Sequence, residues 1–210
     1  SAPTIISSIV AINTQNGTDL ICEGGEVEVS VSITDAFHNP MDSSLYTYVW
    51  YRNGFEDPLL HGPWFRESPL AVDGDSTRYT YSAVIHLGIP GCEFSNSLDD
   101  TITVVRNPVV DIYGDPYVCE YQPIILNARV NGDYQVVSEP NTNGTFYWYR
   151  DGEMRTGYVP TIYGEYYEEP TFTQSGSNII GDPTTGYAHR FQVEYVNSNG
   201  CSGFSPEFLV

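Results

Sequence analysis

Few residues in this sequence of 210 residues have types and spacings that could do chemistry. The histidines, at positions 38, 61, 86 and 189, show no metal-ligand spacing, and His-Glu-X-X-His is absent. The nucleophile elbow Gly-X-Ser-X-Gly and the common phosphate-binding loops are also absent. Lysine does not occur, which excludes Schiff-base chemistry and lysine nucleophiles. The sequence therefore predicts a protein that is not an enzyme.

Carboxylates are the remaining candidates for chemistry or for binding a metal ion. Asp99 and Asp100 are adjacent, so on a strand they point to opposite faces and are poorly placed to act together. Asp73 and Asp75 are candidate calcium ligands, because calcium prefers hard carboxylate oxygens. The alternative, which we favour, is a solvated acidic surface. We expect no other cofactor.

The four cysteines fall two in each half of the chain, at Cys22, Cys92, Cys119 and Cys201. No Cys-X-X-Cys motif occurs and no histidine lies beside any of them, so we expect disulfides rather than reactive thiols. Disulfides persist in oxidising compartments, so the cysteines favour an exported protein.

The charge of the chain excludes some partners. Acidic residues outnumber basic ones 27 to 8, which gives a formal net charge of −19. Phosphate backbones and anionic lipid surfaces would repel such a chain. No run of 18 apolar residues is present that could span a membrane. We therefore expect neither nucleic-acid binding nor membrane insertion.

The elements that would position these residues are strands throughout. Residues 26–33 alternate apolar and polar side chains, and residues 124–130 do the same in the second half. The sequence YVWYRNG, 48–54, returns as FYWYRDG, 146–152. Asn-Gly and Asp-Gly tolerate the positive φ angles of tight hairpins. Further alternating strands are expected at 78–87 and 189–196, each followed by a Gly-Cys turn.

The repeat divides the chain into two domains. Its period of about 98 residues favours two small domains over one large one. Asn107-Pro108 marks the boundary, because proline cannot continue a strand ladder. No segment shows a period of 3.6 residues. We predict an all-β protein of two tandem immunoglobulin-like β-sandwiches, 1–106 and 107–210.

Trp50 and Trp148 follow a cysteine by about 28 residues and lie where such sandwiches place their central core aromatic. We expect both to be core residues. The unmatched Trp64 lies in a stretch, 59–69, that the sequence predicts as an irregular loop. Anchoring a satellite apolar cluster is the favoured role for it. The alternative is a sugar-stacking surface, for which the candidates are Trp64, Tyr163, Tyr166 and Tyr167.

A Cys-X-Gly before a Val-rich strand, then Tyr-X-Trp, then Tyr-X-Val leading to Asn-Gly-Cys closely resembles a known family. It is that of the immunoglobulin-like and PKD-like repeats of Bacteroidota exported surface proteins, among them gliding-motility adhesins. The second half matches better, because Ile89-Pro90-Gly91-Cys92 departs from the Asn-Gly form. Exported proteins of this group carry O-linked glycans at Asp-Ser/Thr motifs, which implies Ser76 and Thr101 as candidate glycosylation sites.

The pairing of the cysteines stays open. In an immunoglobulin topology, a cysteine before the second strand and one after the sixth lie at opposite ends, about 26 Å apart for eight residues. A disulfide needs Cα atoms about 6 Å apart. Pairing between modules, Cys22 with Cys201, and pairing within modules are therefore both kept as alternatives. In the first case Cys92 and Cys119 would pair with preceding and following modules.

The resemblance implies a secreted, non-catalytic module at the cell surface, acting as a stalk repeat or filament subunit. Its partners would be neighbouring immunoglobulin-like modules or copies of itself. A lectin-like module that binds surface glycans is the alternative function, and the accessory domains of a secreted hydrolase are another.

Overall fold

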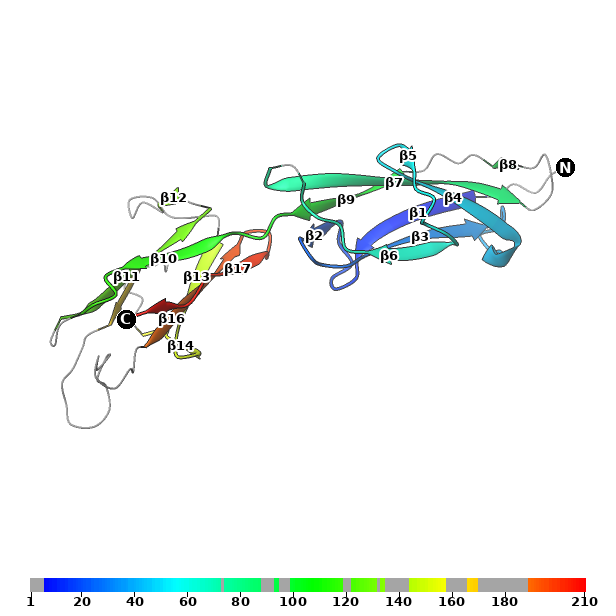
Figure 1. The fold of residues 1–210 in the computed structure, drawn as a ribbon. Coiled ribbons are helices and arrows are strands. Elements are labelled where there is room, and N and C mark those ends of the chain that lie inside the picture. Colours follow the sequence, from blue (N-terminus) through cyan, green and yellow to red (C-terminus); the bar gives the residue numbers. More distant parts are fainter. Residues whose placement is uncertain are drawn as a thin grey trace. The chain divides into compact units, whose positions relative to one another are not determined.

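The computed structural model describes residues 6–72, 74–87, 93–94, 99–118, 122–131, 133–134, 144–157, 166–169 and 189–210. The chain separates into two compact units, Ser1–Arg106 and Asn107–Val210. Each unit buries a hydrophobic cluster of its own, and Figure 1 shows the strands that build them. We describe the two units separately.

The first unit is a sandwich of two sheets. One sheet has the order β1-β3-β6 and is antiparallel throughout. The other has the order β2-β9-β7-β4-β5, with β8 paired to β7. The strands are β1 (Ile6–Asn13), β2 (Leu20–Cys22), β3 (Val27–Thr34), β4 (Tyr46–Arg52), β5 (Phe55–Glu56), β6 (Trp64–Glu67), β7 (Ser76–Leu87), β8 (Glu93–Phe94) and β9 (Asp99–Val105). A single 3₁₀ turn, η1 (Ser43–Leu45), precedes β4.

Alternation of side chains builds the core of this unit, as the sequence predicts. In β3 the residues at 27, 29, 31 and 33 are buried, whereas the polar residues between them are not. Trp50 of β4 is fully buried. Its ring meets the edge of Phe65 at 4.9 Å between centroids, and Phe65 meets Tyr81 of β7 at 5.8 Å. Aromatic rings from both sheets thus fill the space between them.

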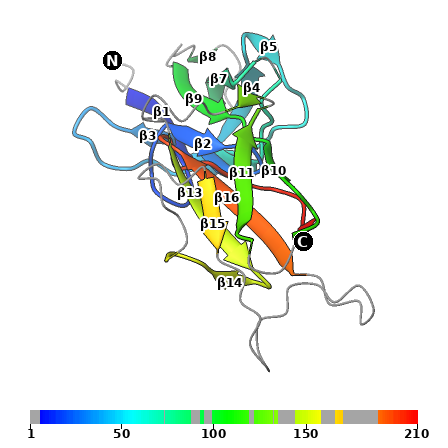
Figure 2. The same ribbon diagram turned by 90° about the vertical axis from the view of Figure 1, so that its left-hand side faces the viewer.

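The second unit repeats this plan. Its first sheet has the order β10-β11-β12, with β15 also paired to β11, and its second sheet has the order β14-β13-β16-β17, with β18 also paired to β16. The strands are β10 (Val110–Gly114), β11 (Ile124–Val130), β12 (Asp133–Tyr134), β13 (Gly144–Arg150), β14 (Glu153–Met154), β15 (Tyr166–Glu169), β16 (Arg190–Asn197), β17 (Ser202–Phe204) and β18 (Phe208–Leu209). Figure 2 shows β11, β13, β15 and β16 from another side.

Matching strands of the two units carry matching rings. Trp148 of β13 packs on Tyr167 of β15 at 5.3 Å, and Tyr167 packs on Phe191 of β16 at 5.5 Å. All three rings are essentially buried. Tyr167 lies opposite Leu126 in the same way that Phe65 lies opposite Val29. The two tryptophans are therefore core residues in equivalent places.

Each tryptophan strand ends in a tight turn with left-handed backbone. Asn53 has φ 52° and is followed by Gly54 at 80°; Asp151 has φ 52° and is followed by Gly152 at 83°. Asn53 Oδ1 accepts a hydrogen bond from Thr80 N at 2.8 Å, and Asp151 Oδ1 accepts one from Arg190 N at 2.9 Å. The turn residue thus fastens each hairpin to the neighbouring long strand.

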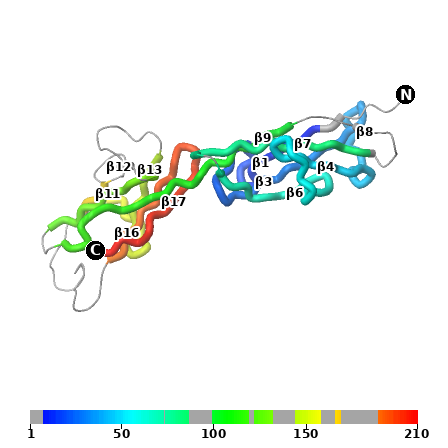
Figure 3. The backbone as a smooth tube through the Cα atoms, turned by 45° about the horizontal axis from the view of Figure 1, so that its top comes forward, coloured from blue at the N-terminus to red at the C-terminus, as the bar shows by residue number. Residues whose placement is uncertain are grey.

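In each unit the chain enters at one end and leaves at the other (Figure 3). Strand β1 starts with Ile6 opposite Thr34, and the last strand of the first unit, β9, finishes with Val105 opposite Ser76 and Cys22. In the second unit β10 starts with Val110 opposite Val130. The final Val210 exchanges two backbone hydrogen bonds with His189, at the start of β16.

One part of the predicted fold is wrong. The stretch 59–69 was expected to be an irregular loop, but it contains β6, where Phe65 pairs with Val29 and Trp64 with Ser30. Only Phe65 in this short strand is buried, so the sequence shows too little alternation to reveal it. None of the helices among the described residues is long and apolar enough to cross a membrane.

Candidate functional site

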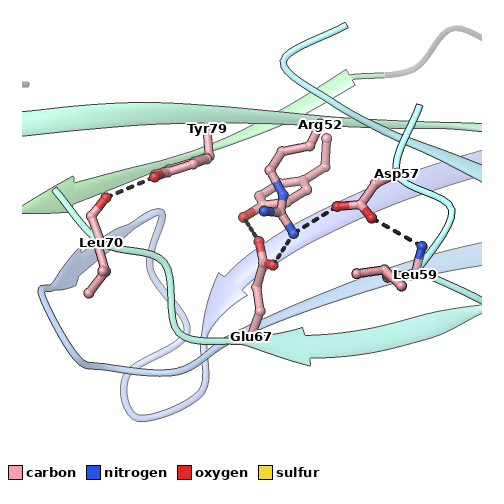
Figure 4. Close-up of polar contacts among 7 residues, drawn as sticks. Arg52, Asp57, Leu59, Glu67, Leu70 and Tyr79 are labelled. Atoms are coloured by element: carbon pink, nitrogen blue, oxygen red, sulfur yellow. Dashed lines mark hydrogen bonds and ion pairs between the residues drawn. The ribbon is translucent and has the colours of Figure 1, made fainter. Parts of the chain in front are cut away.

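A group of interacting charged side chains lies in the first unit, at the Asn53 end of the tryptophan strand (Figure 4). Arg52 ends β4, Glu67 ends β6, and Tyr81 lies on β7. The Arg52 guanidinium pairs with the carboxylates of Glu67 and Asp57, the latter at 3.1 Å from Nη2 to Oδ2. The Tyr81 hydroxyl donates to the other oxygen of Glu67. We call these four residues the Arg52 cluster.

The Arg52 cluster joins the two sheets of the sandwich. Glu67 belongs to the β1-β3-β6 sheet, whereas Arg52 and Tyr81 belong to the opposite one. The side chains of Arg52 and Glu67 are 33% and 17% exposed, so the pair is only partly open to water. A carboxylate that accepts from both an arginine and a phenol has its main acceptor sites satisfied, as a buried charge requires.

The electrostatics of Tyr81 point to a structural role. Burial raises its pKa well above the usual value of 10.0, and its hydrogen bond to the Glu67 carboxylate adds to the rise. A phenol that resists ionisation is a poor nucleophile and a poor general base near neutral pH. The arrangement can therefore hold strands together, but it does not prepare a reacting group.

Loops next to this cluster are fastened by further hydrogen bonds. Tyr79 donates from its hydroxyl to Leu70 O at 2.8 Å, and Asp57 Oδ1 accepts from Leu59 N at 3.1 Å. The Trp50 indole donates to Gly62 O at 2.9 Å. Figure 4 shows the first two of these contacts beside the cluster. The segment between β5 and β7 is thereby pinned to the body of the first unit.

The cysteines lie at strand ends. Cys22 ends β2, where Glu23 N donates to Val105 O at 2.8 Å. Cys201 follows β16 and is fully buried, and its N donates to Asn197 Oδ1 at 2.9 Å. Both are disulfide-bonded, as expected for an exported protein. Cys92 and Cys119 lie outside the described residues.

Three of the four candidate stacking aromatics are among the described residues, and they differ in exposure. Tyr167 is buried between Trp148 and Phe191, so it is a core residue with no ring face left for a sugar. Trp64 is 57% exposed on β6, and the Arg66 guanidinium lies 6.0 Å from its ring centroid. Tyr166 belongs to the other unit, where its hydroxyl donates to Glu168 at 3.3 Å. Tyr163 lies outside the described residues.

The candidate modification and calcium residues differ in accessibility. Ser76 is exposed at the start of β7, whereas Thr101 is half-buried and shares a hydrogen bond of 3.3 Å with Thr80. Asp75 is exposed, and Asp73 lies outside the described residues. Among the residues that the structure describes, no three His, Cys, Asp or Glu side chains gather as a metal site would require.

No protein-family model and no curated protein matches the chain. Several solved structures align with the chain at low identity. Fibronectin(III)-like modules of CbhA from Clostridium thermocellum align over 98% of this chain and 94% of theirs, with 12% identity and a TM-score of 0.39. The three N-terminal domains of the outer capsid protein Hoc of bacteriophage RB49 align over 96% and 69%, with 12% identity and a TM-score of 0.48. The ectodomain of mouse nectin-like molecule 4 aligns over 99% and 62%, with 15% identity and a TM-score of 0.32.

The sheet orders of the two units confirm the predicted fold class. The chain is all-β, and its units are immunoglobulin-like sandwiches. Sequence reasoning missed the Arg52 cluster. The repeated Tyr-Arg at the end of each tryptophan strand was its only signal, because Glu67 and Tyr81 reach Arg52 through contacts 15 residues or more away in the chain.

Proposed function

We propose that this chain is a non-catalytic structural module of an exported surface protein, acting as a stalk repeat or filament subunit. The observation that carries the proposal is the path of the chain through each unit, from Ile6 at one end to Val105 at the other, and from Val110 to Val210. A unit connected in this way transmits a pull from the segment before it to the segment after it.

Other features agree with a mechanical role. The side chains of the Arg52 cluster cross-link the two sheets of the first unit, and burial keeps the Tyr81 phenol neutral. Disulfide bonding of Cys22 and Cys201 is consistent with an extracellular location. Neighbouring modules of the same kind, or copies of the chain, are the partners that a series connection requires.

The test is to pull single reduced molecules by their two termini. If each unit folds and resists force by itself, two separate unfolding events are expected. Each would release about 100 residues, or about 350 Å of contour length at roughly 3.5 Å per residue. Extension without any resisted event would contradict the proposal.

A second measurement addresses the lectin alternative. Trp64 is the exposed tryptophan among the described residues, while Trp50 and Trp148 are buried. Quenching of tryptophan fluorescence by acrylamide therefore reports mainly on Trp64. We expect soluble sugars to leave this quenching unchanged, in the natural chain as in a Trp64→Phe variant. A sugar that protects Trp64 in the natural chain alone would favour the lectin instead.

A further inference from the structure

Aromatic side chains gather on the outward face of the β14-β13-β16-β17 sheet in the second unit. In β13 the residues on either side of Tyr147 are buried, so Tyr147 and Tyr149 point outward. Tyr147 is 38% exposed, and Phe204 of β17 is 55% exposed. Met154 of β14 pairs with Tyr149 and is also exposed. Exposed aromatic and methionine side chains on one face are typical of a surface that binds a partner.

A carboxylate lies in the middle of these rings. Glu194 of β16 pairs with Tyr147 on one side and with Phe204 on the other. Neighbouring strands are about 5 Å apart, so both residues have their Cα atoms about that far from the Cα atom of Glu194. The Tyr149 hydroxyl donates to Glu194 Oε2 at 3.2 Å, and the Tyr149 ring centroid lies 6.0 Å from that of Phe204. We call these four residues the Glu194 patch.

The negative charge of the Glu194 patch has no cationic partner among the residues that the structure describes. Burial and the neighbouring Glu194 carboxylate raise the pKa of Tyr149, so this phenol is neutral at pH 7. Its hydrogen bond therefore leaves the charge of the carboxylate uncompensated. Glu194 is only half-buried, and within the described part of the chain its Oε1 atom accepts no hydrogen bond. This oxygen is thus open to a donor from outside.

The fold does not require an aromatic ring or a charge at these positions. The first unit pairs Val49 with Val84 where the second pairs Tyr147 with Glu194, and Val49 and Tyr147 each directly precede the core tryptophan of their strand. Both valines are half-buried. The same sandwich is therefore built without the ring and the carboxylate, which favours a binding role for them in the second unit.

The chemistry of the patch fits a guanidinium group. Arginine stacks its flat face on aromatic rings and pairs with a carboxylate through parallel N–H donors. A lysine ammonium is more strongly hydrated and cannot make the paired contact. The formal net charge of −19 attracts basic partners and repels a second copy of the chain. Charge and ring chemistry thus favour the same class of partner.

We propose that the Glu194 patch docks an arginine side chain of a basic partner protein. The guanidinium donates to the Glu194 carboxylate, and its flat face packs on the exposed rings of Tyr147 and Phe204. Arginine and tyrosine are the side chains that most often dominate the binding energy of an interface. This inference goes beyond the mechanical function and does not rest on it, because the patch belongs to one unit.

The test uses the two methionines of the chain as reporters. Met154 lies opposite Tyr149 beside the patch, whereas Met41 packs against the core of the first unit. Protein labelled with ¹³C at the methionine methyl groups gives one NMR signal for each. The probe is the peptide Gly-Gly-Arg-Gly-Gly with blocked termini. We expect it to shift the Met154 signal saturably and to leave the Met41 signal in place.

Two further peptides test the choice of arginine. In one the arginine is replaced by citrulline, which has the same shape without the charge, and in the other by lysine. Both should bind more weakly than the arginine peptide. No shift of Met154 with the arginine peptide would overturn the proposal, as would equal shifts with all three peptides.

Variants with a matched control separate the patch from the general charge of the chain. Glu194→Gln should weaken binding of the arginine peptide by about tenfold. Glu153→Gln is the control, because Glu153 is exposed and adjacent to Met154, so it points to the other face of β14. Its loss should weaken binding by less than about twofold. Equal losses would mean that only net charge attracts the peptide, which would overturn the proposal.

Phe204→Leu keeps an apolar side chain but removes a ring, and it should weaken binding of the arginine peptide by about threefold. An unchanged affinity would contradict the role of the rings. The Met154 signal of each free variant, at its natural position, shows that the second unit has folded.

A carbohydrate is the other ligand that rings around a carboxylate could bind. A Met154 shift with cellohexaose, and none with the arginine peptide, would make the patch a sugar surface and overturn the proposal. The pulling experiment tests the mechanical function separately. Units that unfold without resistance contradict that function alone, and an unshifted Met154 signal contradicts the docking site alone.

Discussion

The two units fill their cores with the same three rings, but they place the phenol hydroxyl on different strands. In the first unit the middle ring is Phe65 and the hydroxyl belongs to Tyr81 of β7. In the second the middle ring is Tyr167, and Phe191 occupies the β16 position. The ladders match residue for residue, since Arg52 faces Tyr81 as Arg150 faces Phe191.

This difference shows which part of the plan the fold requires. The rings, their register and the tight turns occur in both units, so they meet the demands of the sandwich itself. The bond from a β7 phenol to Glu67 is peculiar to the first unit, because Phe191 has no hydroxyl to donate. Sheet-to-sheet packing thus depends on ring volume, and the Arg52 cluster adds to it locally.

The largest change in unfolding free energy is expected from the core tryptophans, which the two units share. Trp50→Ala and Trp148→Ala each remove a fully packed indole and should cost about 3–5 kcal/mol of unfolding free energy. The loss should be confined to the mutated unit, because each unit has its own core. Chemical denaturation followed by hydrogen exchange in each unit would check this. Equal destabilisation of both units by either variant would contradict it.

A smaller change in unfolding free energy is expected from the Arg52 cluster, in which the two units differ. Glu67→Gln removes the charge that faces Arg52 and should destabilise the first unit by about 1–3 kcal/mol, since the pair is only partly exposed. Glu28→Gln is the matched control, because Glu28 pairs with Arg66 on the exposed face of the same sheet. The control should cost less than about 1 kcal/mol. Equal losses in urea denaturation would mean that the Arg52 cluster adds nothing.

The raised pKa of Tyr81 makes the first unit sensitive to alkali. The folded unit keeps the phenol neutral, whereas the unfolded chain ionises it near the usual pKa of 10.0. The contribution of Tyr81 is therefore complete below about pH 10 and declines as the pH rises further. Tyr81→Phe should flatten the fall in stability between pH 9 and 11. Parallel curves for natural and variant protein would contradict this.

The smallest change in unfolding free energy is expected at the first hairpin turn. Asn53→Asp keeps the Oδ1 acceptor and the short side chain that tolerates positive φ. This exchange should change the unfolding free energy by less than about 0.5 kcal/mol, whereas Asp151→Asn should cost more, because the Asp151 carboxylate also pairs with His189. Asn53→Ala, which removes the acceptor, is the control and should cost more in the same thermal denaturation assay.

The sequence predicted what depends on local pattern. The alternation in 26–33 and 124–130 predicted β3 and β11, and the repeated tryptophans predicted the buried rings. It did not predict β6, because that strand is stabilised by pairing with β3 rather than by its own composition. The alternative that Tyr167 is a stacking aromatic on a loop is wrong, and only the contacts with Trp148 and Phe191 show its burial.

The turn at Asn53 and Gly54 also bears on how this protein would age. An asparagine before glycine is prone to lose its side-chain amide, because the glycine nitrogen can attack the neighbouring carbonyl and form a cyclic imide. Opening of that imide can leave aspartate at position 53, which still offers Oδ1 to Thr80 N. A molecule that had reacted in this way would have aspartate in both hairpin turns, at position 53 as well as at position 151.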